Sequence, residues 1–156
     1  MSQLESQNAS TFIYVTYIRT TPDKVWAALT DPDRMRQYWL GARGESEFTP
    51  GASWRLVFDD GRVADAGEIV EAEPNKRLVI KWRNHWSPEM HEEGFSQCAM
   101  DIEEAKGAVK LTVTHSMDRP QSKLIGEVSG GWPQILSNLK TLLETGEALF
   151  GDKSAA

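Results

Sequence analysis

Six tryptophans are the most distinctive chemical feature of this 156-residue chain. An indole ring combines a large apolar surface with one hydrogen-bond donor, which suits the wall of a site for a flat or amphipathic molecule. The same rings could instead fill the interior without any ligand. Trp26 lies at helical spacing with apolar neighbours, so we assign it to the core. Trp82 and Trp132 are the first candidates for a pocket wall, followed by Trp54.

His115 ends an apolar strand face that it shares with Leu111 and Val113. In that position an imidazole could orient a ligand or titrate near neutral pH. A histidine in the core or at its rim, bonded to a backbone carbonyl, is the more ordinary alternative, and we prefer it. We include His115 among the residues that would contact a ligand and assign no catalytic residue.

Two further histidines, His85 and His91, flank a loop that carries Glu89, Glu92 and Glu93. Imidazole and carboxylate ligands together suit zinc. The spacing of these residues fits no established ligand pattern, so we expect a solvated loop. The sequence predicts no metal ion and no cofactor.

Nucleophilic catalysis finds no support in the motifs of this chain. There is no Gly-x-Ser-x-Gly and no glycine-rich phosphate loop. Cys98 is the only cysteine, so no internal disulfide can form, and we expect it to pack in the core. A pocket without a nucleophile can still accelerate a cyclisation by holding a substrate in shape, so an enzyme remains an alternative.

The region from 130 to 149 is predicted to be a long helix around which the other elements are arranged. Pro133 suits a first helical turn, and Gly146 or Gly151 can end the helix. A wide apolar stripe of this kind must be buried against another element. The stripe has the three-and-four spacing of one helix face and consists of Trp132, Ile135, Leu136, Leu139, Leu142, Leu143 and Leu149.

The chain before this helix is dominated by strand patterns. After a strand at 11–19, Thr21-Pro22-Asp23 and Asp31-Pro32-Asp33 predict two short helices that end by Gly41. A hairpin meander of roughly six strands should follow, with a loop at 84–94 and a connector at 119–129 that has room for a short helix. A long helix lying across a curved antiparallel sheet leaves a pocket between the two.

Composition and charge restrict the classes of function. The net charge of −6 argues against a nucleic-acid partner, because binding phosphates needs a basic patch. No apolar run approaches the length of a membrane span, and the N-terminus lacks the features of a signal peptide, so we expect a cytoplasmic protein. We expect one domain at 11–149, a disordered N-terminus at 1–10 and a tail at 150–156.

Several short pieces, in this order and spacing, are those of a known family. They are Thr20 to Trp26, Ala28 to Pro32, Trp39 with Gly41, Asp60-Gly61-Arg62, Gly67 to Glu71 with Pro74, Leu78 to Trp82, Leu111 to His115, and Gly131-Trp132. Through them the chain, over about residues 11–147, resembles the heat-shock-protein-90 ATPase activator-like (Aha-type) family of the START-like (SRPBCC, helix-grip) superfamily. Pro133 departs from the pattern, because the helix of relatives often runs through this position.

The resemblance implies an α+β helix-grip fold: a curved antiparallel sheet of about six to seven strands wrapped on a long C-terminal helix, with two short helices after the first strand. It also implies a cavity, and we predict that the protein binds or carries a small hydrophobic or amphipathic molecule there. An enzyme of the cyclase, dehydrase or hydrolase type, using His115 and an acid, is one alternative. A chaperone-associated or regulatory interaction module is another, and a homodimer is left open. The predicted ligand contacts are Trp39, Trp54, Phe58, Trp82, Trp86, Met100, His115, Trp132 and Leu136.

Overall fold

The computed structural model describes residues 9–150, so most of the predicted N-terminal segment and tail lies outside the described residues. Within that range the strands are β1 (Ser10–Ile18), β2 (Ala42–Ser46), β3 (Ser53–Phe58), β4 (Val63–Glu73), β5 (Arg77–Asn84), β6 (Ser96–Ala105) and β7 (Ala108–Met117). The helices are α1 (Pro22–Thr30), α2 (Pro32–Met35), α3 (Pro88–Glu92) and α4 (Lys123–Thr145).

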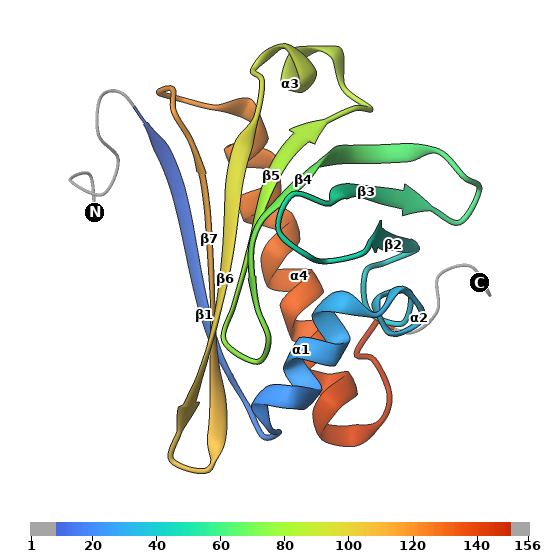
Figure 1. Ribbon diagram of the computed structural model, residues 1–156, viewed down its shortest axis with the longest axis vertical. Helices are drawn as coiled ribbons and strands as arrows, with labels where there is room; N and C mark the ends of the chain where they lie inside the picture. The colour runs from blue at the N-terminus through green and yellow to red at the C-terminus, as the bar shows by residue number, and fades with distance from the viewer. Residues whose placement is uncertain (1–8, 151–156) are drawn as a thin grey trace.

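All seven strands form one antiparallel sheet in the order β1-β7-β6-β5-β4-β3-β2. The sheet curves around α4, and α1 and α2 lie at one end of the space between them (Figure 1). The predicted helix-grip fold is therefore confirmed. The sequence analysis did not predict β2, because Arg43, Gly44 and Glu45 show no apolar alternation, and this strand forms by pairing with β3.

The long helix starts earlier than predicted. It begins at Lys123 and runs through Pro133, so the predicted start near Gly130 is wrong. Ser122 caps the first turn by accepting a hydrogen bond from the Ile125 N–H, at 3.1 Å. Leu124 and Ile125 are buried in a small apolar cluster, and this burial favours helix in what was expected to be a connector.

The two-residue period of the strands determines which face meets α4. Leu111, Val113 and His115 are buried on β7, whereas the residues between them are only partly buried on the other face. On β5, Leu78, Ile80 and Trp82 are buried in the same cluster, which Leu136 and Leu139 of α4 complete. The long helix therefore lies across the sheet, as predicted, and packs on these strand faces.

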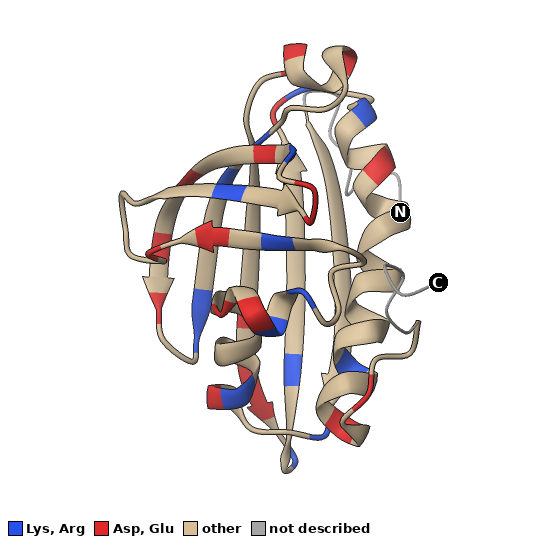
Figure 2. Ribbon diagram, turned by 90° about the vertical axis from the view of Figure 1, so that its right-hand side faces the viewer, with Lys and Arg blue, Asp and Glu red and all other residues tan. Residues whose placement is uncertain are grey.

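Apart from the buried Asp65, the charged residues of the described chain are at least partly exposed. Lys and Arg alternate with Asp and Glu on the strands and short helices, while α4 carries no charge between Glu127 and Lys140 (Figure 2). That uncharged length is the part of α4 that supplies Trp132, Ile135 and Leu136 to the core. Among residues 9–150, no helix has the combination of length and apolarity needed to cross a membrane.

Candidate functional site

A small, largely enclosed apolar cavity lies where α4, the sheet and the segment around α1 and α2 meet. Its volume is about 10 Å³, which is roughly the space of one water molecule. Four tryptophans and two methionines make up more than half of its wall. The lining residues are Leu29, Met35, Tyr38, Trp39, Trp54, Ile80, Trp82, Met100, Trp132 and Leu136.

Three different parts of the fold bring the four indoles together. Trp54 and Trp82 come from β3 and β5, Trp132 comes from α4, and Trp39 comes from the turn after α2. The ring centroids of Trp54 and Trp82 are 4.7 Å apart, and those of Trp39 and Trp132 are 5.4 Å apart. Trp82 is also 6.0 Å from Trp132 and 6.2 Å from Trp39, so the rings form one continuous aromatic cluster.

Gly67 of β4 allows the closest of these ring contacts. It pairs with Trp54 on one side and with Trp82 on the other, and it places no side chain between the two indoles. A Cβ atom at this position would lie 1.7 Å from the carbonyl oxygen of Lys81, a distance that backbone atoms cannot accommodate. Position 67 therefore requires glycine, and the two indoles meet across it.

Trp39 stands at the mouth of the cavity. It is the one partly exposed residue among the ten in the described wall, since the other nine are buried. The preceding residue, Tyr38, is fixed on both sides: its hydroxyl donates to the Ala28 carbonyl at 2.7 Å, and its own carbonyl accepts from Asn138 at 3.1 Å. The following residue, Leu40, has a positive φ of 55°, which is strained for a non-glycine residue.

Six of the nine predicted ligand contacts line this cavity: Trp39, Trp54, Trp82, Met100, Trp132 and Leu136. Trp82 lies deep in the cavity and not at its mouth, because β5 continues beyond it to the buried Asn84. The predicted ligand contacts did not include four of the lining residues. The four are Leu29, Met35, Tyr38 and Ile80.

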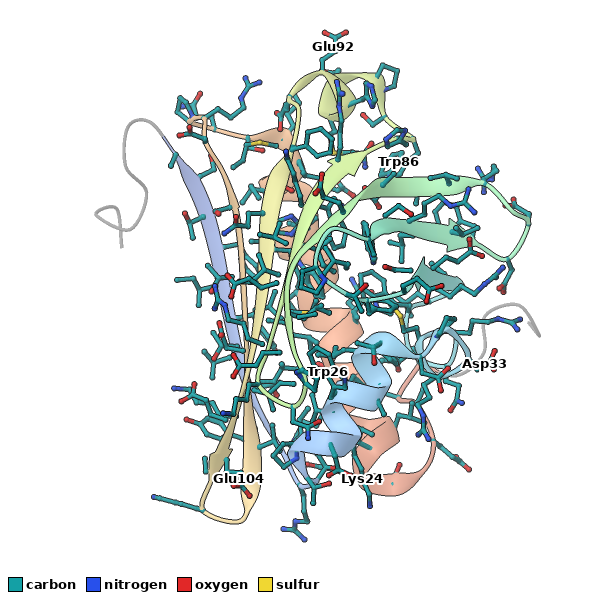
Figure 3. The ribbon with its side chains drawn as sticks, in the orientation of Figure 1. Lys24, Trp26, Asp33, Trp86, Glu92 and Glu104 are labelled. Carbon is teal, nitrogen blue, oxygen red and sulfur yellow. The ribbon has the colours of Figure 1, made fainter. Side chains whose placement is uncertain are left out.

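The structure places Trp86, Phe58 and His115 outside the cavity wall. Trp86 is 52% exposed and lies beside α3, far from the α1 helix that carries Trp26 (Figure 3). The side-chain oxygen of Asn84 accepts hydrogen bonds from the backbone N–H groups of Trp86 and Ser87, which turns the chain outward after β5. Phe58, at the end of β3, is only partly buried and stacks on the Arg62 guanidinium.

His115 links α4 to the sheet through a chain of hydrogen bonds. The Ser96 hydroxyl donates to the Trp82 carbonyl, so His115 Nε2 must carry the proton and donate to Ser96 Oγ, at 2.8 Å. The indole N–H of Trp132 donates to His115 Nδ1 at 3.1 Å. Burial lowers the pKa of His115 to about 3. The imidazole is therefore neutral at physiological pH and bonded to side chains, not to the backbone carbonyl that we expected.

Asp65 is a buried acid that the sequence analysis missed. Its side chain accepts a hydrogen bond from Asn84 Nδ2 at 3.2 Å, and burial raises its pKa to about 6. The indole N–H of Trp82 lies near this carboxyl and lowers its pKa in opposition to burial, but the two groups do not meet hydrogen-bond geometry. The available signal was the two-residue period, which places Asp65 on the same face of β4 as Ile69.

The loop that carries His85 and His91 forms no metal site in the part of the chain that the structure describes, because no three His, Cys, Asp or Glu side chains come close enough to share an ion. His91 Nδ1 is instead hydrogen-bonded to the Asn84 carbonyl at 2.8 Å.

Comparison with known protein families identifies the fold. A sequence model described as "Activator of Hsp90 ATPase homolog 1-like protein" matches residues 19–144. The chain belongs to this family. None of the curated proteins matches it significantly.

Three solved structures illustrate the similarity of this fold to known proteins. Protein MLL2253 from Mesorhizobium loti is 26% identical over 86% of this chain and 96% of its own, with a TM-score of 0.74. DynU16, from the dynemicin biosynthetic locus, is 28% identical over 88% of this chain and 48% of its own, with a TM-score of 0.70. The Aha1 dimer from Colwellia psychrerythraea shares 17% identity over 89% of this chain and 99% of its own, with a TM-score of 0.73.

Proposed function

We propose that this protein binds a small apolar or amphipathic molecule in the tryptophan cavity and holds or carries it there. The observation that supports this proposal most is the convergence of Trp39, Trp54, Trp82 and Trp132 on one cavity beneath α4. Aromatic walls with few polar groups are typical of small-molecule sites. The similarity to DynU16, which comes from a biosynthetic locus, is consistent with small-molecule binding.

A ligand requires a change in the position of Trp39. The cavity of about 10 Å³ is too small for an organic molecule, whereas an apolar cavity of about 150 Å³ binds benzene. Trp39 is the partly exposed lining residue and precedes the strained Leu40, so its ring can turn outward with the least loss of packing. The space released is that of one indole ring, which suits a bicyclic aromatic molecule.

The test replaces the ring at the mouth. Indane, a neutral bicyclic hydrocarbon of indole size, should bind the parent protein, and Trp39→Ala should bind it about tenfold more tightly. The reason is that, in this variant, indane does not have to displace the Trp39 ring from its contacts with Trp82 and Trp132. Each of these contacts is worth about 0.5–1.5 kcal/mol. Titration calorimetry measures the affinity, and the rise in unfolding temperature with indane concentration checks it independently.

Trp86→Ala is the matched control, because this exposed indole lies outside the cavity. It should leave both indane affinity and unfolding temperature unchanged. The proposal fails if indane binds neither the parent nor Trp39→Ala, since the second variant holds the space open without any motion.

An enzyme that uses the cavity would need an acid or base in contact with the bound molecule. Both ring nitrogens of His115 are engaged, by Ser96 and by Trp132. Asp65 does not line the cavity and lies near the indole N–H of Trp82. The geometry therefore favours ligand binding over catalysis. We also propose that the protein is located in the cytoplasm.

A further inference from the structure

The indole N–H groups of the cavity wall differ in whether they have hydrogen-bond partners. The Trp132 N–H donates to His115, and the Trp82 N–H faces the Asp65 carboxyl, although outside hydrogen-bond geometry. The Trp54 N–H is buried with no hydrogen-bond partner. A buried donor without a partner is unusual in a native structure and points to a missing acceptor.

The position of the Trp54 nitrogen connects it to the cavity. A Cβ atom built on Gly44 would lie 3.3 Å from Trp54 Nε1 and 2.9 Å from the terminal methyl of Met35, so these three groups meet at one point. Met35 and Trp54 both line the cavity, and the nearby Tyr38 hydroxyl already donates to Ala28. Trp54 Nε1 is thus a buried polar atom of the described wall that has no hydrogen-bond acceptor and lies against the apolar end of Met35.

We propose that the Trp54 N–H selects the ligand, which is a neutral, flat aromatic molecule carrying a carbonyl oxygen that accepts this hydrogen bond. This inference rests on the proposed function and narrows its class of ligand. Neutrality follows from the lining: no charged residue lines the cavity, so a ligand ion of either sign would be buried there without a counter-ion. A ligand carboxylate would be buried there without a cation, which is costly, so fatty acids are disfavoured.

The experiment compares 1-indanone with indane, two bicyclic molecules that differ by one carbonyl oxygen. Each is titrated into the parent, Trp54→Phe and Trp82→Phe by calorimetry. Trp54→Phe should weaken 1-indanone about tenfold more than it weakens indane, the fold-change expected for one lost hydrogen bond. Trp82→Phe removes an equally buried ring of the same wall and should weaken both molecules by the same factor. The cost of taking the ketone out of water cancels in this cycle.

Gly44→Ala tests the same point without removing the indole. The added methyl would stand against Trp54 Nε1, while the flexible end of Met35 can move away from it. This variant should also lose more affinity for 1-indanone than for indane. In the parent protein, the infrared carbonyl stretch of bound 1-indanone should lie below its frequency in an apolar solvent, a readout that needs no variant.

Two negative results are distinguishable. Binding of both molecules with the same ratio in every variant, together with a carbonyl frequency like that in an apolar solvent, overturns the assignment of Trp54 and leaves the proposed function standing. Failure of both molecules to bind the parent and Trp39→Ala means that the cavity takes no such ligand, and the proposed function fails with the inference.

Discussion

Trp82 is held in place by buried polar residues on three neighbouring strands of the sheet. On one side Asp65 lies near its indole N–H, and on the other the His115 ring centroid is 4.9 Å from its own. Ser96 pairs with Trp82 in the sheet and donates to its carbonyl oxygen. The Ser96 hydroxyl and the His115 imidazole are both hydrogen-bonded, so this side of the Trp82 ring packs against a connected polar network. The floor of the cavity is therefore more constrained than Trp39 at its mouth.

The buried carboxyl of Asp65 should destabilise the protein at neutral pH. Its pKa is raised from an ordinary 3.8 to about 6, so the native state binds the proton more tightly than the unfolded chain does. The resulting stability is present at low pH and is lost as pH rises through about 6. Asp65→Asn should therefore raise the free energy of unfolding at pH 7.5 by up to about 3 kcal/mol, and the gain should shrink toward pH 4.

Urea unfolding of the parent and of Asp65→Asn across this pH range measures the difference. His115 acts in the opposite direction, because its lowered pKa removes stability as pH falls below about 6.5, but this contribution is common to both proteins and cancels. Glu68→Gln, an exposed acid on the same strand, is the control and should change little. A gain that is the same at every pH would mean that the Asp65 carboxyl does not titrate in this range.

The helix α4 is attached to the other elements along its C-terminal half. Lys140 donates to the Tyr17 carbonyl at 2.6 Å, and Glu144 accepts from the Arg19 N–H at 2.8 Å, so the helix is joined to the end of β1. Asn138, buried in the same half, donates to the Tyr38 carbonyl and accepts from the Phe150 N–H. One helix thus carries a cavity wall residue, Trp132, and also anchors the segment that leads to Trp39.

Leu139 tests whether this half of α4 is docked. The side chain is fully buried in the main core, so Leu139→Ala should lower the free energy of unfolding by about 2–5 kcal/mol. Leu149→Ala is the control, since this leucine is more than half exposed and its truncation should cost little. Chemical denaturation of the three proteins gives the comparison. Equal midpoints for the parent and Leu139→Ala would show that the helix does not depend on this contact.

At the scale of the whole molecule, β1 carries a row of exposed apolar side chains. It lies at one end of the strand order, so it has a strand neighbour on only one side. Its outward residues Ile13, Val15 and Tyr17 are 49%, 43% and 53% exposed. Exposed apolar side chains gathered in this way favour association with another chain. The homodimer that the sequence analysis left open therefore has a candidate surface.

We expect the protein to form a symmetric dimer through β1, and Val15→Lys to convert it to a monomer. The substitution places one charge from each copy in the apolar surface that both copies would bury. Because Val15 is exposed in the single chain, the fold of each subunit should be unaffected. Light scattering coupled to size-exclusion chromatography gives the mass of both proteins. A parent that stays monomeric as its concentration is raised would contradict the prediction, as would a Val15→Lys variant that stays dimeric.

Local periodicity was sufficient to predict much of this fold. The alternation Val109, Leu111, Val113, His115 identified the buried face of β7 correctly, because successive side chains of a strand must point to opposite faces. The helix was less well predicted. Pro133 looked like a first turn, but the burial of Leu124 and Ile125 by residues distant in the sequence extends the helix before it.

The cavity depends on contacts that no local pattern contains. Trp82 and Trp132 were expected on inward faces, but only the tertiary structure shows that they meet Trp39 and Trp54. Trp86, equally aromatic in sequence, is turned outward by the Asn84 side chain. The register of three strands places Gly67 between two indoles and sets Asp65 near Trp82. Sequence alone determines which face of each element is apolar, whereas the positions of side chains relative to one another, and hence their hydrogen bonds and pKa values, are decided by how the elements pack.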